Sequence, residues 1–121
     1  FELMFQKVAK KVESGARFFQ TQAVFERRAM ERFVNAMLPL GVPVIAGVLL
    51  IRSGKMARFL NDNIPGVKVP DDLVERLDKA SDPMAEGITI ARETVAWARD
   101  VCQGVHLMTL GHEDKIPAIL A

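Results

Sequence analysis

The chain has 121 residues, half of them hydrophobic, which suffices for one domain with a sizeable core. Its 16 basic and 15 acidic residues leave a net charge of +1, which gives no electrostatic basis for binding nucleic acid or an anionic membrane. The single cysteine excludes an internal disulfide and favours a reducing, cytoplasmic location, and one cysteine with two histidines argues against structural zinc. The longest apolar run, residues 42–51, is about half as long as a membrane helix, so no membrane partner is expected.

The first half of the chain predicts helices alternating with strands. Residues 2–14 have helical periodicity, and Gly15 ends the helix. A short buried strand is expected over residues 17–22, followed by a long helix over residues 26–38. The next stretch, residues 44–51, is a continuous apolar run of branched side chains, which is typical of a parallel strand buried on both faces.

The second half is expected to hold further helices and a third strand. In chain order these are a helix over 55–63, a helix over 72–80, a helix over 83–101, a strand over 105–110 and the start of a helix over 115–121. Ser53 and Asp71 are the predicted N-caps of the first two helices, and Pro83 takes the favoured first position of the third.

Strands separated by helical crossovers pair in parallel, so we expect an α/β fold with about three parallel strands and flanking helices. An eight-stranded barrel needs about 200 residues or more. The chain is therefore either a small open sheet or the C-terminal portion of a (β/α)8 TIM barrel. A start without Met and an end inside a predicted helix favour the barrel portion.

Ligands of such folds gather at the carboxyl ends of the strands, where the first strand ends in Gln-Thr-Gln. Amides and a hydroxyl hydrogen-bond a planar heterocycle well, so all three residues are candidates to face a ligand. Gln20 is expected to share a face with Gln22. A strand-end amide that satisfies loop backbone is the competing interpretation of Gln22.

Three further residues have reactive side chains. His106, in the third strand, is expected to be a hydrogen-bonded core histidine. His112 follows that strand, and substrate contact and plain solvation both remain open for it. Cys102 is expected to be a small packing residue.

Residues 11–22 read Lys-Val-Glu-Ser-Gly-Ala-Arg-Phe-Phe-Gln-Thr-Gln, which resembles the methylenetetrahydrofolate reductase signature of a Lys, a Gly-Ala and a terminal Thr-Gln. Further segments resemble this family in the same order: Phe25-Glu26 with Phe33, residues 43–49, residues 67–70, Gly87 with Ile88 and Ala91, and residues 104–110. Some members carry an aromatic residue where this chain has Gly54, and a basic residue where it has His112.

The resemblance implies a flavin-containing barrel, with FAD or another flavin, that reduces 5,10-methylenetetrahydrofolate to 5-methyltetrahydrofolate with NAD(P)H. Residues 1–121 would form its C-terminal half. Gln22 would hydrogen-bond the pterin ring, and Lys11, with Lys10, would contact the flavin phosphates. Met108 and Leu110 would line the substrate pocket, and Gln20 and His112 are further candidates for contact with the substrate.

The expected partners are the rest of the barrel or a companion subunit, in a homo- or hetero-oligomer. Two alternatives remain open. One is a non-catalytic α/β assembly subunit that pairs through its open sheet edges. The other is a pterin-binding methyltransferase subunit.

Overall fold

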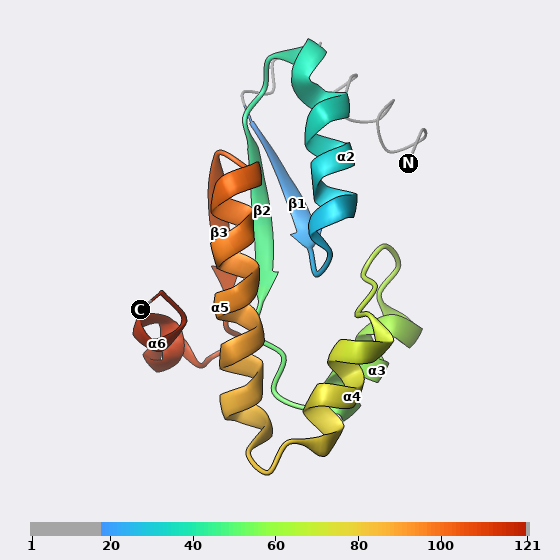
Figure 1. Cartoon of the computed structure of the whole chain (residues 1–121), viewed down its shortest axis with the longest axis vertical. Helices are drawn as coiled ribbons and strands as arrows, with labels where there is room; N and C mark the ends of the chain where they lie inside the picture. Colours follow the sequence, from blue (N-terminus) through green and yellow to red (C-terminus); the bar gives the residue numbers. More distant parts are fainter. Residues whose placement is uncertain (1–17, 121) are drawn as a thin grey trace.

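The computed structural model describes residues 18–120, so the helix predicted over residues 2–14 and the candidate phosphate contacts Lys10 and Lys11 lie outside the described residues. Within this range three strands and five α-helices follow one another (Figure 1): β1 (Phe19–Ala23), α2 (Arg27–Met37), β2 (Val44–Leu49), α3 (Gly54–Asn63), α4 (Asp71–Lys79), α5 (Pro83–Val101), β3 (Gly104–Met108) and α6 (Ile116–Leu120). Two short 3-10 helices, η1 (Leu38–Leu40) and η2 (Glu113–Lys115), follow α2 and precede α6.

The strands form one parallel sheet in the order β1-β2-β3, which confirms the predicted parallel pairing. α2 connects β1 to β2, and α3, α4 and α5 connect β2 to β3. The β2–β3 pairing is unbroken from Ile45 opposite Gly104 to Leu49 opposite Met108. Neighbouring parallel strands in sequential order are consistent with part of a TIM-type barrel.

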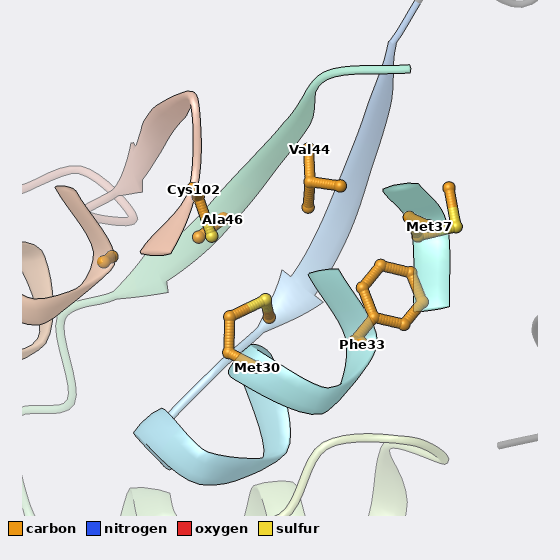
Figure 2. Packing of buried hydrophobic residues seen from close by; sticks show 7 residues of the cluster. Met30, Phe33, Met37, Val44, Ala46 and Cys102 are labelled. Atoms are coloured by element: carbon orange, nitrogen blue, oxygen red, sulfur yellow. The ribbon is translucent and has the colours of Figure 1, made fainter. Parts of the chain in front are cut away.

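One face of the sheet is covered by α2 and α5. The buried side chains of α2 are Met30, Phe33 and Met37, whose spacing forms a single helical stripe. They pack on Val44 and Ala46 of β2, as Figure 2 shows. Each such side chain contributes about 1.5–3 kcal/mol on burial, so this layer fixes α2 against the sheet.

α5 continues the same layer toward β3. Its Ala91 and Val95 pack with Val48, and Ala98 joins the cluster around Val44. Cys102, the C-cap of α5, is buried there as the predicted packing residue, and burial raises the pKa of its thiol.

The observed strands are shorter than the predicted ones. β1 starts at Phe19 and alternates between half-buried and exposed residues, and Phe18 before it is 55 % exposed. β2 ends at Leu49, although Leu50 and Ile51 beyond it are buried. β3 ends at Met108, because Leu110 adopts a left-handed backbone with φ of 51°.

Two predicted helix starts are confirmed and one is wrong. The Ser53 hydroxyl accepts a hydrogen bond from the Met56 N–H at 3.1 Å, and Pro83 occupies the first turn of α5. Asp71 is not an N-cap, since Pro70 has that place and Asp71 lies in the first turn. A carboxylate there complements the helix dipole instead. None of the helices in residues 18–120 has the length and apolarity needed to cross a membrane.

Candidate functional site

The sheet face opposite α2 and α5, here called the open face, carries Gln20, Gly47, His106 and Met108. Side chains of Val44, Ala46 and Val48 point to the helices, so alternate residues of β2 point the other way. In the β2–β3 pairing, Gly47 lies opposite His106 and Leu49 lies opposite Met108. The side chains of His106 and Met108 therefore point to the same face as residues Gly47 and Leu49. Polar groups therefore meet on this face around a glycine.

Gln20 and His106 are joined by a hydrogen bond across β2, from the amide Nε2 to the imidazole Nδ1. Because an amide N–H donates, the imidazole Nδ1 is the acceptor in this contact. His106 is thus hydrogen-bonded as predicted, but it is exposed rather than in the core. The prediction of a core position was wrong because the sequence of a strand does not determine which of its two faces is covered by helices.

Thr21 shares a cavity wall with Gln20 and Gln22, the other two residues of the predicted Gln-Thr-Gln set, but its hydroxyl is bonded within the sheet. Its hydroxyl accepts a hydrogen bond from the Gly47 N–H at 3.0 Å and donates one to the Gln22 carbonyl at 2.7 Å. The β1–β2 register shifts between Gln20 and Ala23, so the hydroxyl replaces a regular ladder contact at a bulge.

The shift also interrupts the expected sharing of a face by the two glutamines. Gln20 reaches His106 on β3, whereas the amide of Gln22 lies against Gly66 in the connection between α3 and α4. A cavity of about 500 Å³ extends along this part of β1, between α2 and the segment that holds Gly66 and Lys68. The exposed Gln22 amide forms part of its wall.

Met108 and Leu110 take different positions after the third strand. A Cβ built on Gly47 would lie 3.0 Å from the Met108 methyl carbon and 3.1 Å from the Gln22 carbonyl oxygen. Met108 therefore packs over Gly47, beside the end of β1. Leu110 is 61 % exposed in the turn beyond β3.

His112 is paired with Arg52, a residue that the sequence reasoning left as an ordinary loop position. The Arg52 Nη1 donates a hydrogen bond to the His112 Nε2 at 3.0 Å, which leaves the imidazole proton on Nδ1. These residues follow the carboxyl ends of β2 and β3, and adjacency of those strands is the signal that would have suggested the contact.

Gly54, where some members of the family that this chain resembles carry an aromatic residue, lies against Asp78. A side chain at this position would run into the carboxylate of Asp78, which is itself held by Arg58 at 2.6 Å. An aromatic residue at the start of α3 would therefore have to displace the Asp78 carboxylate.

Among residues 18–120, no group of three or more His, Cys, Asp or Glu side chains is arranged to hold a metal ion. On the open face the exposed Gln20–His106 pair can hydrogen-bond a planar organic ring, whereas the space over Gly47 is filled by the Met108 methyl and the Thr21 and Gln22 carbonyls. The phosphate groups of a flavin would need cations, and the two expected ones lie outside the described residues.

A search of curated proteins finds no match to the chain. A sequence model described as methylenetetrahydrofolate reductase matches residues 1–121, the full length given. The chain therefore belongs to the methylenetetrahydrofolate reductase family.

Proposed function

We propose that this chain supplies the folate-binding side of a flavin-dependent oxidoreductase that converts 5,10-methylenetetrahydrofolate to 5-methyltetrahydrofolate with NADH or NADPH. Family membership supports a folate-related oxidoreductase. The observation that carries the assignment of the site is the Gln22 amide, exposed in the wall of a cavity at the carboxyl end of β1.

The proposed enzyme needs more of the barrel than residues 18–120 provide. Within that range β1 and β3 each have one edge without a partner strand, and unpaired edges are usually covered. We infer that residues 1–121 form the C-terminal half of a TIM barrel. Further strands of the same polypeptide, or of a companion subunit, would complete it.

Gln22 is the proposed pterin contact. A primary amide offers two N–H donors in one plane, which can donate to the nitrogen and carbonyl acceptors along the edge of a pterin. Its position at a strand end, on a bulge tied to β2 through Thr21, gives the amide a fixed backbone. Gln22 would therefore set the orientation of the ring.

The remaining site residues would hold and enclose the ligands. A bound flavin supplies the hydride chemistry. Lys11 and Lys10 would hold its phosphates, and Met108 over Gly47 would present a polarizable, flat contact to a ring. Leu110, exposed in the turn after β3, would line the substrate pocket.

The pair formed by Arg52 and His112 is proposed as the contact for the anionic part of the folate. The exposed guanidinium donates one hydrogen bond to the imidazole, and its other N–H groups remain available for a carboxylate. No carboxylate of residues 18–120 is ion-paired with Arg52.

The test is a nicotinamide oxidation assay on the full-length protein with 5,10-methylenetetrahydrofolate. The proposal predicts oxidation of NADH or NADPH that depends on both the folate and a bound flavin. Folate-dependent methyl transfer without nicotinamide oxidation would point to the methyltransferase alternative. A stable complex through the sheet edges, with no affinity for folate or flavin, would point to the assembly subunit.

A further inference from the structure

The connection between α3 and α4, residues 64–70, lies against the Gln22 amide. We propose that this connection positions Gln22, with Gly66 providing the space in which its amide rests and Asn61 holding the connection in place. The inference rests on the proposed pterin contact of Gln22 and adds the residues that control its orientation.

Asn61 of α3 fixes the far end of the connection. Its side-chain Nδ2 donates to the Val69 carbonyl at 3.1 Å, and its Oδ1 accepts from the Val69 N–H at 2.7 Å. Val69 itself is 0 % exposed and packs in a cluster with Ile51 and Ala57. At the near end, Val67 N–H donates to the Ile64 carbonyl at 3.2 Å. The backbone on both sides of Gly66 is therefore anchored.

Gly66 has a left-handed backbone with φ of +86°, and the Gln22 amide occupies the space where a Cβ at Gly66 would lie. The Oε1 atom of Gln22 is the first atom that a Cβ at Gly66 would meet, while the Gln22 Nε2 would be 3.8 Å away. The amide therefore turns its carbonyl toward the connection and its N–H groups away from it. In this orientation Gln22 donates to an acceptor atom of the ligand ring.

A methyl group at Gly66 would have to displace the amide, because the end of a flexible side chain yields more readily than an anchored backbone. Gly41 provides a matched control. It also has a left-handed backbone, with φ of +66°, but a Cβ there would meet nothing within 4 Å. Gly66→Ala and Gly41→Ala share the backbone strain, and the displacement of Gln22 is specific to the first.

The experiment measures the dissociation constants of 5-methyltetrahydrofolate and of the flavin on the full-length protein. Gly66→Ala is expected to weaken folate binding about tenfold, the effect of one misplaced hydrogen bond, with flavin binding unchanged. Gly41→Ala is expected to change neither. In a Gln22→Ala background, Gly66→Ala should have no further effect, because the residue it acts through is gone.

The outcomes separate the inference from the proposed function. Folate binding that is unchanged in Gln22→Ala refutes the pterin contact. A clear loss in Gln22→Ala, together with no loss or an additive loss from Gly66→Ala, overturns the positioning role and leaves the pterin contact standing.

If the Gly66→Ala variant does not fold, Asn61→Ala releases the same connection by removing its hydrogen bonds to Val69, without placing a side chain on a left-handed backbone. Asn63→Ala is its control, since the Asn63 side chain bonds only within α3, to the Phe59 carbonyl at 3.0 Å. Weaker folate binding in Asn61→Ala alone supports the inference. Equal behaviour of the two variants contradicts it.

Discussion

Replacing Thr21 by Val tests the bulge that carries Gln22. The hydroxyl of Thr21 links the Gly47 N–H to the Gln22 carbonyl, and Gly47 is buried. Val keeps the branched shape of the side chain but offers neither hydrogen bond. The lost bonds contribute roughly 0.5–1.5 kcal/mol each, and a buried donor without a partner costs about 1–3 kcal/mol. We therefore expect the free energy of unfolding to fall by about 2–3 kcal/mol.

The assay is urea unfolding of the full-length protein followed by far-UV circular dichroism. With a urea dependence of about 1–3 kcal/mol per molar, the midpoint should fall by about 0.7–3 M. Thr89→Val is the matched control, because that exposed hydroxyl donates only within α5, to the Ala85 carbonyl at 3.1 Å. Its effect should stay within about 0.5 kcal/mol. Equal midpoints for the two variants would refute the bridging role of Thr21.

Two other predictions concern titratable groups. Arg76 donates two hydrogen bonds of 2.9 Å to Glu93, and these bonds lower the pKa of the Glu93 carboxyl. The pair therefore stabilises the folded protein at pH values above the ordinary glutamate pKa of about 4.3. This contribution is lost as the pH falls through the lower pKa that Glu93 has in the folded protein. Arg76→Gln should flatten the decline of unfolding free energy between neutral and acid pH, and parallel curves for variant and wild type would contradict this. The buried Cys102 thiol, whose pKa is raised, should react slowly with a thiol reagent at neutral pH and rapidly once urea unfolds the protein. Rapid reaction of the native protein would contradict the packing of this residue.

Most of the fold follows from local patterns in the sequence. The stripe of Met30, Phe33 and Met37 identifies the buried side of α2, and the continuous apolar run of β2 indicates a strand under helices. The exposure of His106 was missed for a physical reason. A strand alternates regardless of which face is covered, and the choice is made by helices distant in sequence.

The site was less predictable because its contacts join distant segments. Gln22 was proposed from the motif at the strand end, yet its neighbour Gly66 is an ordinary turn glycine by local criteria. The bulge at Thr21 exists only once β1 is paired with β2, and Arg52 meets His112 only because β2 and β3 are adjacent. Tertiary pairing, rather than local propensity, creates each of these contacts.

The most direct test of the account compares Gln22→Ala with the wild type in the full-length protein, by equilibrium binding of 5-methyltetrahydrofolate and by flavin content. Loss of the amide should weaken folate binding about tenfold or more, since a ligand hydrogen bond and its orientation disappear together. Flavin content should remain that of the wild type. Equal losses of folate and flavin, or no loss of either, would contradict the assignment of Gln22 to the pterin.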